Sequence, residues 1–136
     1  MKTSPIIALR QGIRAVVSAD LALMEALGGR TIFDEPPRQT PTPHILFGES
    51  QLRDWSCDIL CGAEQFFTLS VITTHHGMAL ALSLSHQLHE RLTTTPPEIS
   101  GHRLIDLSCL AIETKRDAAG RFAKVNLRYR ATSEYL

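Results

Sequence analysis

Two cysteines and two histidines lie close together in the middle of the 136-residue sequence, where they could in principle hold a metal ion. Cys57 and Cys61 are four residues apart, and His75 and His76 follow. A structural zinc site needs four ligands, and its cysteines usually come in pairs separated by two residues. The spacing here is different, and the remaining cysteine, Cys109, stands in an apolar run typical of a small core residue. The pattern therefore favours two thiols in a loop, and we expect no bound metal.

The other polar residues form no recognised catalytic pattern. His86 and His89 are three residues apart, without the arrangement of a metalloprotease helix, which favours a polar helix face. The carboxylates form no evident acid–base pair, and no serine stands in the context of a nucleophile elbow. Gly48, Gly62 and Gly101 are isolated, so they do not make a phosphate-binding loop. The sequence therefore predicts neither an enzyme nor a cofactor.

Two features instead indicate contacts with other macromolecules. Lys124, Arg128 and Arg130 alternate with apolar residues near the C-terminus. Such a stripe is typical of a solvated sheet face, and it would also suit a surface between subunits or one that lines a passage for DNA. Trp55, the single tryptophan, follows Asp54 near an expected turn. It is either a contact anchor or a side chain that closes one end of the core.

Length and composition predict one globular domain over residues 1–136. The sequence is 43% hydrophobic and 21% charged, as in ordinary soluble proteins. Its formal net charge is zero, so it offers no electrostatic reason to bind DNA or an anionic membrane non-specifically. Three cysteines exclude a full disulfide framework and favour cytosolic thiols. No apolar run could span a bilayer and no signal-peptide pattern is present, so we expect a protein that is cytoplasmic when made.

Helices are expected in the first part of the chain and again in its middle. Ser4 and Pro5 are a typical helix start, and apolar residues follow at helical spacing. Asp20 predicts the cap of a shorter helix that ends at residues 28–29, where two glycines permit a left-handed backbone. A further helix is expected over residues 78–92. It carries leucines at every fourth position: Leu80, Leu84, Leu88 and Leu92.

The remaining segments predict strands joined by turns. Four prolines make residues 35–43 an extended surface loop, and residues 117–120 predict a hairpin loop. Strands are expected at 30–34, 44–56, 62–73, 104–113 and 121–132. Because most of these strands follow one another through hairpins, we predict an α+β fold with a mainly antiparallel sheet packed against two helices.

Three short motifs occur in order along the two expected strands at 44–56 and 62–73: Pro-His-Ile-Leu-Phe-Gly-Glu at 43–49, Asp-Trp-Ser at 54–56 and Gly-Ala-Glu at 62–64. A Leu-Gly-Gly-Arg turn at 27–30 precedes them, and an Arg-Asp-Ala-Ala-Gly-Arg hairpin at 116–121 follows. This order resembles the tail-completion, or tail-terminator, proteins of siphovirus-like phages and gene transfer agents. The resemblance spans nearly the whole chain and includes no catalytic motif.

The resemblance implies a structural virion protein. Such a protein would form a hexameric ring at the head-proximal end of the tail, bind the tail tube protein and a head connector or adaptor, and let DNA pass without binding it specifically. It would assemble in the cytoplasm, end in the virion, and need no cofactor and no membrane. The implied contact residues are the turn at Asp54 and Trp55 and the last strand, with Lys124, Arg128 and Arg130.

Several other functions stay open at this point. Within the same class, the chain could be a head–tail adaptor or a minor tail component. From other classes, it could be a small thiol- or metal-dependent enzyme that uses Cys57, Cys61 and a histidine, or a cytosolic regulatory binding module.

Overall fold

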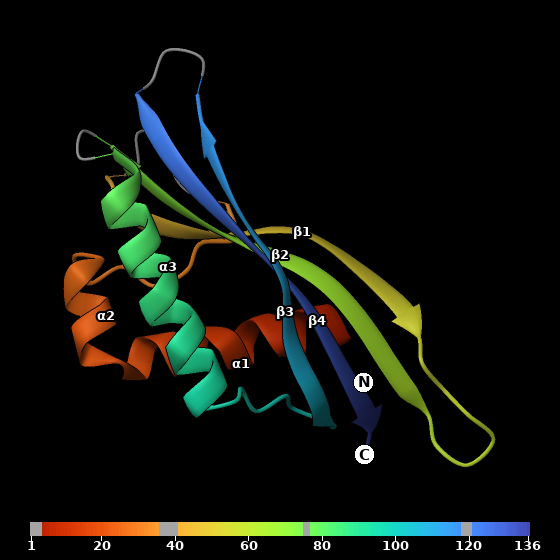
Figure 1. The fold of residues 1–136 in the computed structure, drawn as a ribbon. Helices are drawn as coiled ribbons and strands as arrows, with labels where there is room; N and C mark the ends of the chain where they lie inside the picture. Colours follow the sequence, from red (N-terminus) through yellow and green to blue (C-terminus); the bar gives the residue numbers. More distant parts are fainter. Residues whose placement is uncertain (1–3, 36–40, 75–76, 118–120) are drawn as a thin grey trace.

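The computed structural model describes residues 4–35, 41–74, 77–117 and 121–136. The helices are α1 (Pro5–Ala19), α2 (Leu21–Ala26) and α3 (Gly77–Thr94), and the strands are β1 (His44–Asp54), β2 (Gly62–Thr74), β3 (His102–Arg116) and β4 (Phe122–Tyr135). The strands form one antiparallel sheet in the order β1-β2-β4-β3. In Figure 1 the helices lie on one side of this curved sheet, and no described helix covers the other side. The predicted α+β fold with an antiparallel sheet is confirmed, with a short third helix.

The core lies between the helices and alternate residues of the two central strands. Successive strand residues point to opposite faces, so every second residue of β2 and β4 can be buried. The buried set comprises Phe67, Leu69, Val71, Val125, Leu127, Tyr129 and Ala131. Full burial of one such large apolar side chain contributes about 1.5–3 kcal/mol, so this face holds the helix layer onto the sheet.

The packing of α3 differs in one position from the leucine repeat. Leu84, Leu88 and Leu92 are buried, whereas Leu80 is 36% exposed and Ala81 takes the buried position. A repeat of four residues drifts by about 40° per step on a helix of 3.6 residues per turn. Leu80 is therefore rotated by about 120° from Leu92, whereas Ala81 is rotated by only about 20°.

The ends of the first two helices follow the predicted signals with one exception. Leu23 N donates to the Asp20 carboxylate at 3.1 Å, which confirms the cap of α2. Gly28 and Gly29 have φ of 68° and 81°, the left-handed conformation that favours glycine after a helix. The Ser4 side chain makes no capping hydrogen bond, and α1 instead begins with proline at its first turn.

The predicted strand at 30–34 is wrong, because only one residue of this segment pairs. Phe33 forms a single parallel bridge beside β1: Phe33 N donates to Ile45 O and Phe47 N donates to Phe33 O, both at 2.9 Å. The next residue, Asp34, turns to Arg10 and Arg14 of α1, at 3.0 and 2.9 Å. Two prolines follow shortly in the sequence and have no N–H to extend a ladder.

Several predictions fall outside the described residues. Residues 36–40 of the proline loop, the His75 and His76 pair, and residues 118–120 of the β3–β4 hairpin belong to this group. What the sequence indicates for them stays a prediction.

Candidate functional site

The uncovered face of the sheet carries the charged residues that the sequence singled out. Arg130 donates to the Glu64 carboxylate through Nε at 2.7 Å and through Nη2 at 2.6 Å. Arg128 Nε lies 3.1 Å from the Glu113 carboxylate. Two of the three predicted cations thus have acidic partners on neighbouring strands. A charge-paired face is better suited to another protein than to the uniformly negative DNA backbone.

The third cation of the predicted stripe lies away from these two pairs. Lys124 stands opposite Lys115 in the β3–β4 ladder, near the end of the sheet where that hairpin closes. Arg128 and Arg130 lie nearer the middle of β4, opposite Thr68 and Phe66. The stripe therefore spans two environments. Arg128 and Arg130 lie near the middle of the sheet and are paired with carboxylates, whereas Lys124 lies at one end beside another lysine.

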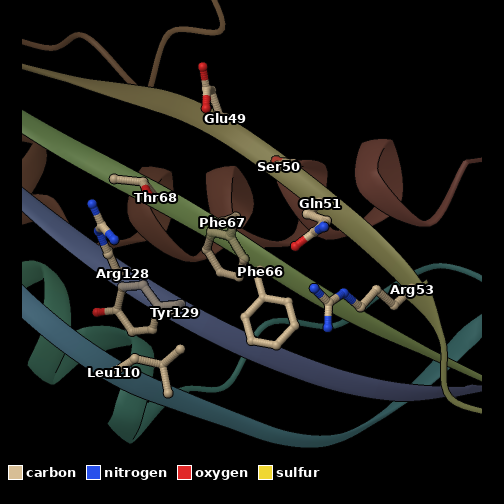
Figure 2. A pocket seen from close by; sticks show the side chains of 10 residues that line it. All are labelled: Glu49, Ser50, Gln51, Arg53, Phe66, Phe67, Thr68, Leu110, Arg128 and Tyr129. Atoms are coloured by element: carbon tan, nitrogen blue, oxygen red, sulfur yellow. The ribbon is translucent and has the colours of Figure 1, made fainter.

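A groove of about 670 Å³ crosses the middle of the uncovered face, and we call it the central groove. Figure 2 shows its lining residues, which are Glu49, Ser50, Gln51, Arg53, Phe66, Phe67, Thr68, Leu110, Arg128 and Tyr129. The Arg53 guanidinium lies over the Phe66 ring at 5.4 Å from its centroid, a cation–π geometry. Leu110 is 54% exposed. The groove therefore has an apolar floor bordered by two basic side chains, Arg53 and Arg128, and by the acidic Glu49.

A bulge in β3 directs Leu110 into this groove. The register against β4 shifts between Cys109 and Ala111, so Leu110 has no partner in the ladder. An extra residue of this kind bends the strand and re-aims its side chain. A second register shift, between Leu104 and Asp106, likewise leaves Ile105 without a partner in the ladder.

Ile105 lines a second groove of about 560 Å³, the tip groove, where β1 ends and β2 begins. Its lining residues are Asp54, Trp55, Ser56, Cys57, Leu60, Gly62, Arg103, Ile105 and Glu134. Trp55 is 42% exposed, so it does not close the core, and its exposure favours the role of a contact anchor. A Cβ on Gly62 would lie only 2.6 Å from Trp55 O, so glycine lets the two sides of the hairpin approach each other at this point.

The loop between β1 and β2 extends their ladder to a narrow end, which we call the hairpin tip (residues 55–61). Trp55 N donates to Gly62 O at 3.0 Å and Cys57 N donates to Leu60 O at 2.9 Å. The Ser56 hydroxyl links the two sides, donating to Asp54 at 2.6 Å and accepting from Gly62 N at 3.1 Å. In Figure 1 the hairpin extends beyond the helices, with this loop at its far end.

The thiols lie in different environments. Cys57 and Cys61 are both exposed and free at the hairpin tip. Backbone hydrogen bonds from Ile59 and Leu60 lower the pKa of the Cys57 thiol. Cys109 packs at the edge of the core, and burial raises the pKa of its thiol. Within residues 4–35, 41–74, 77–117 and 121–136, no three metal-ligating side chains gather into a site.

The two histidines of α3 have separate partners rather than a shared ligand. His86 Nε2 lies 3.1 Å from the Glu90 carboxylate on the exposed side of the helix. His89 Nδ1 lies 2.9 Å from the Tyr129 hydroxyl, which stands at the edge of the core. The predicted polar face is thus confirmed for His86, whereas His89 is partly buried and faces Tyr129 of the sheet.

Sequence reasoning named Asp54, Trp55, Arg128 and Arg130 but missed the apolar half of the surface. The structure brings Arg128 together with Phe66, Leu110 and Arg53, and it brings Trp55 together with Ile105. The available signal was a broken alternation in β3: Leu104-Ile105 is a consecutive apolar pair, and Cys109-Leu110-Ala111-Ile112 is an apolar run.

Comparison with known proteins gives two matches of consequence. The family described as "Tail completion protein gp17" matches residues 11–134. Chains of solved structures also match, and one of them comes from a structure described as "Virion of native gene transfer agent (GTA) particle". It is 26% identical, the match covers 98% of this chain and 99% of that chain, and the TM-score is 0.85. No curated protein matches. No described helix is long and apolar enough to cross a membrane.

Proposed function

Because the chain belongs to the tail completion protein gp17 family, we propose that it closes the head-proximal end of a siphovirus-like tail and joins that tail to the head. The coarse role is that of a structural protein of the tail and head junction in a virion. Its support is a family match over most of the chain and a similar chain in a gene transfer agent virion, covered almost end to end.

The proposed form is a closed hexameric ring. A ring needs two different surfaces on each subunit, so that one surface of a copy binds the other surface of the next. The uncovered sheet face and the projecting hairpin supply two such surfaces. One side of the ring would meet the tail tube protein and stop further addition of tube subunits, and the other side would meet the head connector or adaptor.

The observation that carries this proposal is the uncovered sheet face with its two grooves. Exposed apolar side chains surrounded by charged ones are typical of protein interfaces. We propose that Asp54, Trp55, Arg128 and Arg130 contact other subunits or tail proteins through this face. Lys124 lies at the far end of the sheet and would face a different neighbour or the DNA passage.

We further propose that the protein works without turnover and without a cofactor. The groups that could do chemistry are engaged elsewhere or exposed at a contact surface: His89 holds Tyr129, and Cys57 lies at the hairpin tip. DNA would pass through the ring without specific recognition, since Arg128 and Arg130 are already paired with carboxylates.

Localisation in the particle tests this proposal. We would attach an epitope tag after Leu136, purify particles and label them with gold-conjugated antibody for electron microscopy. The expected result is label confined to the junction of head and tail. Label along the whole tube, at the distal end of the tail, or absent from particles that contain all other tail proteins would contradict it.

A further inference from the structure

We propose that the hairpin tip of one copy docks into the central groove of the next copy, so that the β1–β2 hairpin is the arm that links neighbouring subunits. This inference rests on the ring proposed above and names the surfaces that build it. It is carried by the chemistry of the two surfaces and by their separation within one chain.

The hairpin tip is apolar and acidic. Ile59 is 90% exposed and Leu60 is 52% exposed at the very end of the arm. Asp58 stands beside them, and the sequence from Asp54 to Cys61 contains no basic residue. Among the described residues, no cation lies within ion-pair distance of Asp58. The tip therefore presents two large aliphatic side chains and an unpaired carboxylate.

The central groove is the chemical counterpart of the tip. Its floor is Phe66 and Leu110, and around it lie Arg53, the acidic Glu49, and Arg128, which is already paired with Glu113 (Figure 2). Arg53 contacts the Phe66 ring, but no carboxylate in the described part of the chain pairs with it. An aliphatic tip with a carboxylate can fill this groove while its charge meets the free guanidinium.

The tip cannot reach the groove of its own chain. Arg53 lines the groove, and Asp58 lies five residues further along the same hairpin. At about 3.3 Å per residue of extended chain, that is roughly 16 Å away. The hydrogen bonds from Trp55 to Gly62 and from Cys57 to Leu60 hold the arm extended, so it does not fold back. A tip that fills the central groove therefore fills the groove of another copy, and two different patches make a head-to-tail contact of the kind that builds a ring when the rotation between copies closes.

The natural thiols of the tip, Cys57 and Cys61, allow a direct test. We would purify particles that carry Leu110→Cys and expose them to oxidised glutathione. One tip thiol and the thiol at residue 110 lose their protons and two electrons as an interchain disulfide forms, and the glutathione disulfide is reduced to two thiols. The expected result is a ladder of cross-linked multimers of this chain on a non-reducing gel, since the tip of each copy meets residue 110 of the next. Adding Cys57→Ser and Cys61→Ser together, which removes both exposed thiols of the tip, should abolish the ladder.

Ile112→Cys is the matched control. Ile112 is 52% exposed on the same strand, close to the 54% of Leu110. It pairs with Leu127, a buried residue of the helix-facing side, so it lies on the opposite face of the sheet from the groove. We expect no ladder from this variant under the same conditions. Equal ladders from both variants would overturn the proposal, because they would indicate random collision.

Charge exchange gives a second test that does not depend on cross-linking. Asp58→Arg and Arg53→Asp should each reduce the yield of joined particles by roughly tenfold or more. When both single variants are made in one cell, copies can alternate around a hexamer so that each contact again joins opposite charges. Yield should then return to near that of the unaltered protein. Yields that stay low on co-expression would contradict the docking mode.

The outcomes separate this inference from the proposed function. Gold label at the junction without a residue 110 ladder would overturn the docking mode and leave the tail-joining function in place. A disulfide from Cys57 to the tube protein would do the same, with the tip assigned to that partner. Gold label absent from the junction would overturn the proposed function itself.

Discussion

Replacing glycine with alanine inside a helix usually stabilises a protein, but at Gly12 we expect the same substitution to lower the free energy of unfolding. Gly12 is buried within α1 and faces the segment after α3. A Cβ at residue 12 would lie 2.2 Å from Glu98 O and 3.3 Å from Pro97 Cβ. The usual C···O contact is about 3.3 Å, so helix and segment must separate by roughly 1 Å. Because the obstacle is a backbone carbonyl, no side-chain rotation relieves it.

Gly12→Ala should therefore destabilise the protein even though alanine is the better helix former. Alanine gains about 1 kcal/mol in helix propensity, whereas overpacking of this kind costs about 3 kcal/mol. The net loss is about 2 kcal/mol, or a fall in Tm of roughly 5–10 °C for a chain of this size. Thermal and urea unfolding followed by circular dichroism measure it. The exposed Ala15 supplies the control: Ala15→Gly should lose about 1 kcal/mol. A Gly12→Ala variant more stable than the unaltered protein would refute the reasoning.

Three further predictions concern titratable groups. Hydrogen bonds from the α2 N-terminus, and secondarily Arg91, lower the pKa of Asp20. Asp20→Asn keeps a capping side chain but removes the charge, so the unaltered protein should be more stable than the variant above about pH 4. That advantage should be lost as pH falls through the lower folded-state pKa. Burial raises the pKa of Tyr129, so its stabilising contribution is present below about pH 10 and is lost at higher pH. Unfolding curves from pH 8 to 11 should show a steeper alkaline loss for the unaltered protein than for Tyr129→Phe, and parallel curves would contradict this. Iodoacetamide followed by peptide mass spectrometry should label Cys57 well before Cys109, because the first thiol is exposed with a lowered pKa and the second is partly buried with a raised one. Equal labelling rates would be inconsistent with the structure.

Much of the fold could be predicted from the sequence, because strand alternation and helix caps depend only on residues that are close together in the chain. The alternation in β4 is such a case: Val125, Leu127 and Tyr129 are buried as the period of two requires. The cap at Asp20 also depends only on neighbouring residues. The position of Leu80 was not predictable from a four-residue repeat alone, since only the pairing of α3 with the sheet selects which side of the helix is buried.

The candidate surface was only half predictable, because its other half depends on contacts distant in sequence. Arg130 pairs with Glu64, which is 66 positions away in the sequence, so no local pattern could predict that ion pair. The bulges at Ile105 and Leu110 arise from the register between β3 and β4, which is a property of the assembled sheet. The outward stripe was therefore visible in the sequence, but its charge pairing and its apolar grooves were not.

The most direct test of the central claim is electron microscopy of particles from cells that lack this gene, with the tail-length distribution measured. We predict tails of uncontrolled, often excessive length beside heads that are full but unjoined, and restoration of normal particles when the gene is supplied again. Particles with normal tail length, joined heads and normal DNA transfer would contradict it.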